Sequence, residues 1–219
     1  MPVSAAERRF ILDELGRQAQ ADMARLWDAA ARMEDVAFAQ FVIDAFPDLV
    51  DPFHQTAAQL AATWFEQSDP DSQYVARVAD PLPVVQLKSS AEWALGADGV
   101  QGLSRLEGTV QRAVFNGARE TTMLNVAATK SKWARHASAN ACEFCRLMAI
   151  RGGVYRSEQT AGAKFHDHCH CLSVEVRRGD YTPPPYVAQW EQDYQNARDE
   201  AGSSDVKKIL AAWRQQGAT

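Results

Sequence analysis

The chain has 219 residues, of which 46% are hydrophobic, so it can bury a packed core and does not have the composition of a disordered protein. Its 23 basic and 28 acidic side chains give a formal net charge of −5, which argues against a general DNA-coating role, because that role needs a basic surface. The N-terminal segment lacks the apolar core of a signal peptide, and no apolar run approaches the roughly 20 residues that span a membrane. We therefore expect a soluble protein with no membrane contact, made in a reducing cytoplasm.

The first part of the chain shows the apolar periodicity of helices. Ser4 and Glu7 have the spacing of a capping box, which predicts that a first helix begins there. Pro47 is expected to interrupt a second helix and Pro52 to open a third, because proline suits only the first turn of a helix. We therefore predict an N-terminal helical region of three helices over residues 1–67. Its large apolar side chains include Phe38, Phe41, Leu60 and Trp64.

Residues 68–136 are predicted to form a connector and central helices. Two prolines favour an extended connector over residues 74–85, and Ser89 or Ser90 is expected to cap a short helix after it. A long helix follows, in which Gly117 is either a break or a weak point that costs roughly 1 kcal/mol relative to alanine. The cationic end of this helix is interpreted as solvated and comprises Lys130, Lys132, Arg135 and His136.

The next segment contains all four cysteines of the chain. Cys142 and Cys145 form a C-x-x-C pair, and His166, Cys169 and Cys171 follow after a glycine-containing spacer. Short-spaced pairs of thiolates or imidazoles are typical of a tetrahedral zinc site, and zinc accepts both sulfur and nitrogen ligands. In one ligand set the four cysteines bind the metal. In the other set, His166 replaces one of the last two cysteines.

Alternating apolar residues after the last cysteine predict a strand over 172–176 that leaves this cluster. If the strand starts early, Cys169 and Cys171 project to one face, while His168 and His170 point away.

Residues 137–219 are predicted to form a small module around the cysteine cluster. A polar helix over 187–201 follows the predicted strand and is expected to end at Gly202. Ser203 or Ser204 is then expected to cap a last helix. The predicted fold is therefore mainly α, with an N-terminal helical region and a C-terminal zinc-stabilised α+β module.

The sequence contains no complete set of catalytic residues that we recognise. A zinc ion with three protein ligands and an open position would activate water, but five good donors in one segment favour a closed structural site. His166, Asp167 and His168 would suit a zinc-braced nuclease, although such folds usually place a second C-x-x-C after the catalytic histidine. Whether the protein is an enzyme is therefore left open.

The segment NACEFCRLMAIRGGVYRSEQTAGAKFHDHCHC resembles the phage head-morphogenesis proteins related to the minor head protein F of phage Mu, in the branch found in actinobacterial phages. That branch has C-x-F-C, then R-G-x-V-Y and a closing H-x-H-C-H-C. The resemblance implies that Cys142, Cys145, His166, Cys169 and Cys171 form the metal cluster. Gly152 and Tyr155 fall in the shared turn, where the resemblance implies a structural role.

The same resemblance implies a minor capsid protein that acts beside the portal during head morphogenesis. The expected partners are the portal protein, with the scaffold and major capsid proteins and packaged DNA as further contacts. The expected location is the inner head near the portal, and the host cytoplasm during assembly. Because members of this branch are often labelled capsid maturation proteases, proteolysis of scaffold or capsid protein is the alternative function.

Overall fold

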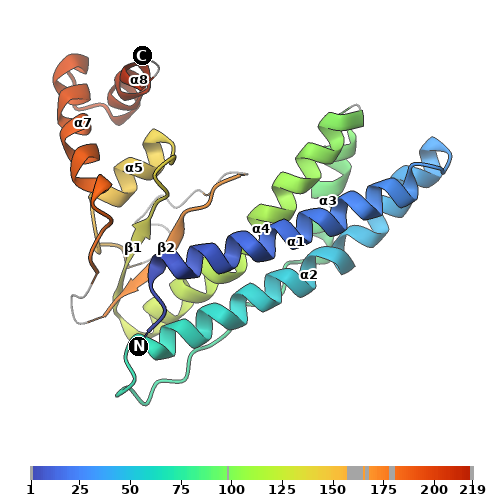
Figure 1. Ribbon diagram of the computed structural model, residues 1–219, viewed down its shortest axis with the longest axis horizontal. Helices are drawn as coiled ribbons and strands as arrows, with labels where there is room; N and C mark the ends of the chain where they lie inside the picture. Colours follow the sequence, from blue (N-terminus) through green and yellow to red (C-terminus); the bar gives the residue numbers. More distant parts are fainter. Residues whose placement is uncertain (1, 98, 157–164, 166–167, 178–180, 218–219) are drawn as a thin grey trace. The chain divides into compact units, whose positions relative to one another are not determined.

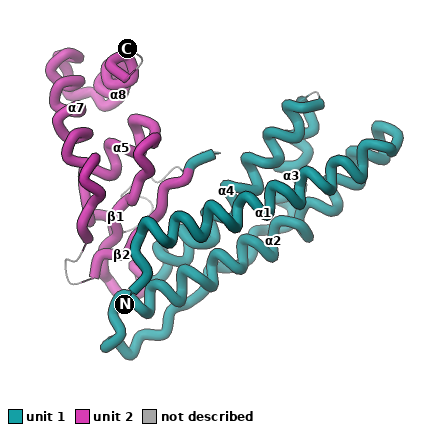
Figure 2. Tube along the Cα trace, in the orientation of Figure 1, with its two compact units in different colours: residues 1–125, 164–169 teal, residues 126–163, 170–219 magenta. Residues whose placement is uncertain are grey.

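The computed structural model describes residues 2–97, 99–156, 165, 168–177 and 181–217. Over these residues the chain forms seven helices and two strands, so the prediction of a mainly α protein with a small sheet is confirmed (Figure 1). The chain divides into two compact units (Figure 2). Unit 1 comprises residues 1–125 and 164–169, and unit 2 comprises residues 126–163 and 170–219. The three segments expected from the sequence, 1–67, 68–136 and 137–219, stay a prediction.

Unit 1 begins with two long helices, α1 (Ala5–Ala30) and α2 (Asp35–Gln67). The predicted capping box is present, because the Glu7 backbone N–H donates to the Ser4 hydroxyl at 3.2 Å and the Ser4 N–H donates to the Glu7 carboxylate at 2.8 Å. Small and apolar residues at helical spacing form the buried stripe of α1, including Leu12, Ala19 and Met23. This stripe packs against α2.

Helix α2 corrects the prediction of three helices over residues 1–67, because it continues through both Pro47 and Pro52. A proline inside a helix removes one backbone hydrogen bond and costs about 3 kcal/mol. The buried face of α2 runs across both prolines and includes Phe46, Val50 and His54. Burial of a large apolar side chain contributes about 1.5–3 kcal/mol, so this face offsets the cost of the two prolines.

Residues 72–83, which include most of the predicted connector, form neither helix nor strand, and α3 (Val84–Leu95) and α4 (Gly99–Thr129) follow them. Helix α3 begins after Pro83, so the prediction that Ser89 or Ser90 caps it is wrong. The preset φ of proline suits the start of a helix, which explains the earlier beginning. Asn125 of α4 holds the connector, since its side chain donates to the Arg77 carbonyl at 2.7 Å and accepts from the Arg77 N–H at 2.8 Å.

Helix α4 is continuous through Gly117, so the alternative of a break there is wrong. A Cβ atom at this position would lie 2.2 Å from the His54 carbonyl oxygen and 3.2 Å from the Ala58 nitrogen of α2. The His54 ring also contacts the Ala113 carbonyl of α4 at 2.9 Å. The two helix backbones therefore approach closely here, and only glycine fits the contact.

Unit 2 contains an antiparallel pair of strands, β1 (Lys132–His136) and β2 (Leu172–Val176), in which Trp133 is opposite Glu175 and Arg135 is opposite Ser173. The predicted strand over 172–176 is confirmed. Three further helices belong to this unit: α5 (Glu143–Ile150), α7 (Tyr186–Ala201) and α8 (Val206–Gln216). Helices α7 and α8 pack on each other and on α5.

Two local predictions in this part of the chain are wrong. The cationic segment before the cysteines is not a solvated helix end but strand β1, in which Arg135 is completely buried and His136 is 5% exposed. Helix α8 is capped by Asp205, whose carboxylate accepts from the Lys207 N–H at 2.8 Å, and not by Ser203 or Ser204. Gly202 ends α7 in the left-handed region at φ 53°, as its position predicted.

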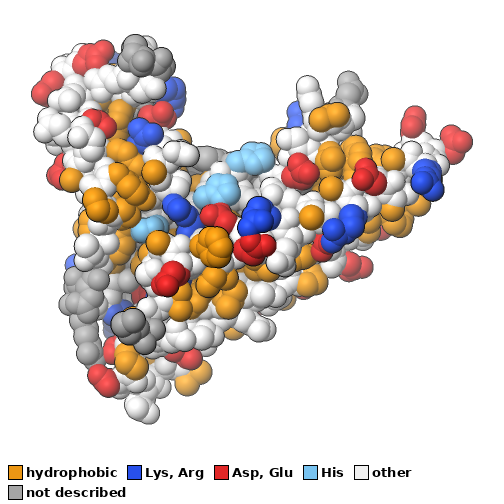
Figure 3. Space-filling view, in the orientation of Figure 1, with side chains coloured by type: hydrophobic (Ala, Val, Ile, Leu, Met, Phe, Trp, Pro, Cys, Tyr) orange, Lys and Arg blue, Asp and Glu red, His pale blue; other side chains and the backbone are white. Residues whose placement is uncertain are grey.

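Charged side chains of both signs are interspersed on the visible face of the unit 1 helices, with apolar side chains between them (Figure 3). Within α1, some charged side chains also pair with each other, such as Arg9 with Asp13 and Arg25 with Asp22. This mixed face agrees with the acidic net charge and differs from the continuous basic surface of a general DNA-binding protein.

Candidate metal centre

Cys145, Cys169 and Cys171 place their sulfur atoms within 4.8 Å of one another. All three side chains are buried, with 1–3% of their surface exposed. In a tetrahedral zinc site, a metal–sulfur distance of about 2.3 Å places the sulfur atoms about 3.8 Å apart. A small contraction of the cluster would therefore let all three sulfurs bind one metal ion.

The start of α5 positions the first of these cysteines. Cys142 precedes the helix in an extended conformation, and the Arg146 N–H donates to its carbonyl at 2.9 Å. Cys145 lies in the first turn, where the positive end of the helix dipole favours a thiolate. The buried guanidinium of Arg135 donates to the Cys145 sulfur at 3.3 Å and adds positive charge there.

Two side chains of α4 fix the backbone at the second cysteine. The Cys169 carbonyl accepts a hydrogen bond from Arg119 at 2.5 Å and another from Gln111 at 3.2 Å. Arg119 is only 1% exposed, and its guanidinium lies 3.9 Å from the centre of the Phe165 ring. These contacts hold Cys169, and the chain connection places Cys171 two residues later.

The turn after α5 supports strand β2. Gly152 has a left-handed φ of 64°, and a Cβ atom on Gly153 would lie 2.6 Å from the Val176 side chain, so both positions suit glycine. Tyr155 is 2% exposed and donates from its hydroxyl to the Met148 carbonyl at 2.9 Å. Burial raises the pKa of this phenol, so the hydroxyl remains a donor at neutral pH.

The five predicted ligands do not all converge in the described structure. Cys142 is half-buried and is not a member of the group of three sulfurs. His166, like Asp167, lies outside the described residues. The ligand set of Cys142, Cys145, His166, Cys169 and Cys171 therefore stays a prediction.

The two interleaved histidines lie outside the group of three sulfurs. His168 and His170 are exposed, and His168 has a left-handed φ of 60° just before Cys169.

The four cysteines all lie in the described part of the chain, where none forms a disulfide.

The supporting residues of the cluster were not identified from the sequence. Arg135 was interpreted as solvated, and neither Gln111 nor Arg119 was singled out. Gln111 and Arg119 are eight positions apart on α4 and therefore share one face of the helix. The sequence offered one signal for these two residues, which is that they are polar and repeat on an otherwise apolar face of the helix.

The centre combines three buried sulfur donors with nearby positive groups, so it could hold a metal ion. Metal ligation requires thiolates, and three thiolates this close would repel one another without a cation between them. A fourth donor would complete a tetrahedral site of the Cys₄ or Cys₃His kind.

The family whose model matches this chain is a viral one, so the chain is a phage protein related to the virion. The chain belongs to the VG15 protein family, whose model matches residues 2–197. No curated protein and no solved structure matches the chain. Over the described residues, no helix combines the length and hydropathy that a membrane span requires.

Proposed function

We propose that the protein is a minor virion component of the Mu F-like kind, which binds the portal during head morphogenesis. Membership of a phage protein family over most of the chain is the observation that carries this proposal. The resemblance of the cysteine-rich segment to Mu F-like minor head proteins adds the portal as the partner. The proposed location is the inner head near the portal vertex.

We further propose that the cysteine cluster binds one structural zinc ion. Zinc is borderline soft and fits a site with three sulfur donors. The fourth ligand is Cys142, three residues before Cys145, or His166. Because the three sulfurs are buried, Cys145 lies in the first turn of α5 and Cys171 directly precedes β2, the metal would brace α5 and β2 against one another. The role of the metal is thus to stabilise the fold.

The portal contact is proposed to lie within residues 1–67. Trp64 is 5% exposed, and the Phe38 ring packs at 4.8 Å on Trp27, so neither side chain offers much surface to a partner. Val36 is 84% exposed and Phe41 is 38% exposed, and both follow the turn between α1 and α2. Since a portal ring presents many equivalent sites, a small contact per copy can be reinforced by multivalency.

The test is co-purification of the chain with its affinity-tagged cognate portal protein after co-expression. The double variant Val36→Ser and Phe41→Ser should lose the portal, because it removes two exposed apolar side chains that follow the turn. The matched control is Val154→Ser with Val206→Ser, which changes exposed valines of unit 2 and should remain bound. Deletion of residues 1–67 is less suitable, because it removes the α2 backbone that packs on Gly117.

If the wild-type chain does not co-purify with the portal, the proposed function is wrong. If the Val36 and Phe41 variant binds as well as the wild type, the contact lies outside this turn.

The alternative of a maturation protease is tested in the same cells. Co-expression with the cognate capsid and scaffold proteins should leave both uncut. Cleavage that disappears in His168→Ala, with the fold intact, would favour the protease instead.

A further inference from the structure

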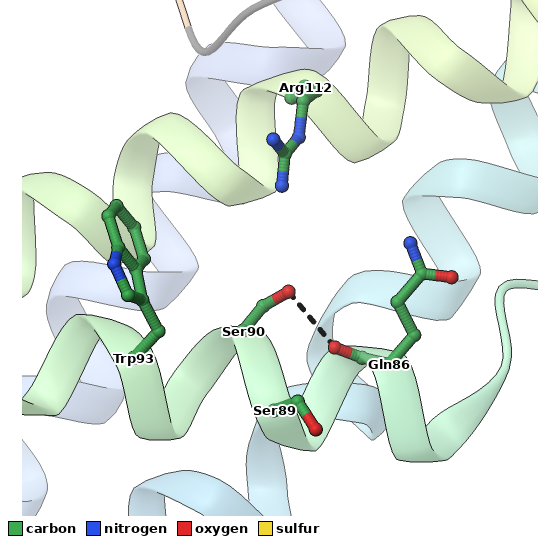
Figure 4. A pocket seen from close by; sticks show the side chains of 5 residues that line it. All are labelled: Gln86, Ser89, Ser90, Trp93 and Arg112. Atoms are coloured by element: carbon green, nitrogen blue, oxygen red, sulfur yellow. Dashed lines mark hydrogen bonds between the residues drawn. The ribbon is translucent and has the colours of Figure 1, made fainter.

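A cavity of about 340 Å³ lies on unit 1 between α3 and α4. Gln86, Ser89, Ser90 and Trp93 line it from α3, and all four side chains are uncharged (Figure 4). Arg112 lines it from α4 but already has an interaction of its own. The lining therefore has no feature that selects one class of ligand. A buried arginine beside the cysteine cluster does have such a feature.

Arg135 has an unusual environment for an arginine, because its side chain is completely buried. It lies on β1 opposite Ser173 of β2, and Cys171 is two residues before Ser173. Its guanidinium donates to the Cys145 sulfur at 3.3 Å and lies 5.6 Å from the centre of the Phe144 ring. The pairing of the two strands thus brings a charged donor to one of the three clustered sulfurs.

This hydrogen bond is strongest when Cys145 is a thiolate, which is the form that binds a metal ion. Hydrogen bonds between an ionised donor and an ionised acceptor are about twice as strong as those between neutral groups. Three or four thiolates also carry more negative charge than one zinc ion balances, and a buried excess charge is costly unless a positive group lies nearby. Arg135 supplies this positive group at the sulfur itself.

One acidic side chain of β2 shares this face of the strand pair. Glu175 is opposite Trp133, two residues from Arg135 along β1, and is 7% exposed. A carboxylate moderates the positive charge of the guanidinium, but it only accepts hydrogen bonds and cannot donate one to sulfur. The donated hydrogen bond is therefore what distinguishes Arg135 from the other charged group on this face.

We propose that Arg135 is a positioning residue of the metal centre. When the centre is loaded, the guanidinium donates to the Cys145 thiolate, fixes the direction of this sulfur and tightens metal binding. Groups that orient a metal ligand in this way commonly change metal affinity by about 10–100-fold. Arg135 and Cys145 both belong to unit 2, so the contact lies within one compact unit. This inference rests on the proposed zinc site.

The first test measures zinc affinity of the full chain by competition with a chromogenic chelator. Arg135→Met removes the charge and the donor but keeps a long apolar side chain, and it should bind zinc about 10–100-fold more weakly. Arg135→Lys keeps a charge and a donor and should recover part of the affinity. Arg146→Gln is the matched control, because Arg146 follows Cys145 on α5 but donates to the Ala141 carbonyl at 2.7 Å. This control should bind zinc like the wild type.

The second test detects the hydrogen bond itself and needs no variant to fold. The wild-type chain is loaded with an NMR-active isotope of cadmium, which also binds thiolates. A guanidinium proton should then show scalar coupling to the metal, transmitted through the Cys145 sulfur. The coupled signal should be lost in Arg135→Lys and kept in Arg146→Gln. A residue that only fills space beside the cluster would give no such coupling.

The outcomes separate this inference from the zinc site on which it rests. Wild-type zinc affinity in Arg135→Met would overturn the role of Arg135 and leave the zinc site in place. Cadmium-loaded wild type without the coupling would do the same, and it decides the question if Arg135→Met does not fold. A wild-type chain that binds neither zinc nor cadmium would show that the proposed zinc site is wrong, and the inference with it.

Discussion

Substitution of Gly117 by alanine sets two opposing effects against each other. In the middle of a helix, alanine is favoured over glycine by about 1 kcal/mol. The added Cβ would lie 2.2 Å from the His54 carbonyl oxygen, however, and neither atom can rotate away, because the Cβ is bonded directly to the α4 backbone and the oxygen is part of the α2 backbone. Overpacking of a tight contact costs about 1–3 kcal/mol, and a rigid backbone contact belongs at the upper end of this range. The net expectation is a loss of about 2 kcal/mol.

Gly16→Ala on α1 is the matched control. Its new Cβ would lie 3.8 Å from the Gln111 side chain, which is ordinary van der Waals contact. This variant should therefore gain up to about 1 kcal/mol from helix propensity alone. Thermal unfolding followed by circular dichroism measures both variants. For a chain of this size, Gly117→Ala should lower the midpoint by about 4–8 °C, and Gly16→Ala should raise it by about 2–4 °C. If Gly117→Ala is as stable as the wild type, α2 and α4 do not approach closely at this position.

Three further predictions concern the metal centre, the connector and a surface ion pair. The purified chain should carry about one zinc ion by elemental analysis. Cys145→Ser should lose this zinc, and unit 2 of the variant should unfold at a lower temperature. A serine variant that keeps its full zinc content would show that Cys145 is not a ligand. Asn125→Ala should lower the free energy of unfolding, measured with denaturant, by on the order of 3 kcal/mol, because it removes the hydrogen bonds with Arg77 and from the Tyr74 hydroxyl. A decrease well below about 1 kcal/mol would show that Asn125 does not hold the connector. The Lys88 ammonium lies 2.5 Å from Asp44 and holds the pKa of that carboxyl below its ordinary value of 3.8. The ion pair therefore stabilises the fold above pH 3.8, and this contribution is lost as the pH falls through the lowered pKa. NMR titration of the Asp44 carboxyl should show its pKa rising toward the ordinary value in Lys88→Met. An unchanged pKa would show that Lys88 does not interact with Asp44.

Helix positions were predictable where local signals and burial agree. The capping box at Ser4 and the left-handed Gly202 both stand where the sequence indicated. The prolines of α2 were misleading, because the penalty of a proline is local while the buried face that offsets it depends on packing against other helices. Gly117 was misinterpreted for the same reason, since only the neighbouring α2 backbone explains why a glycine is needed there.

The cysteine-rich segment was predictable as a cluster but not in detail. Chain spacing alone brings Cys169 and Cys171 close together, and β2 follows them as its alternating pattern indicated. Strand β1 was missed because a short segment with two cations has no clear apolar alternation. Arg135 is buried beside the Cys145 sulfur, a placement that depends on pairing with a strand almost forty residues later. Contacts of this kind are set by tertiary structure and leave little trace in a single sequence.

The most direct test of the proposed function is a cryo-EM reconstruction of the portal vertex of assembled heads. We expect density for this chain on the portal, with α1 and α2 at the contact and one strong metal peak among Cys145, Cys169 and Cys171. A portal vertex without this chain, in heads that contain the protein by mass spectrometry, would contradict the proposed portal contact.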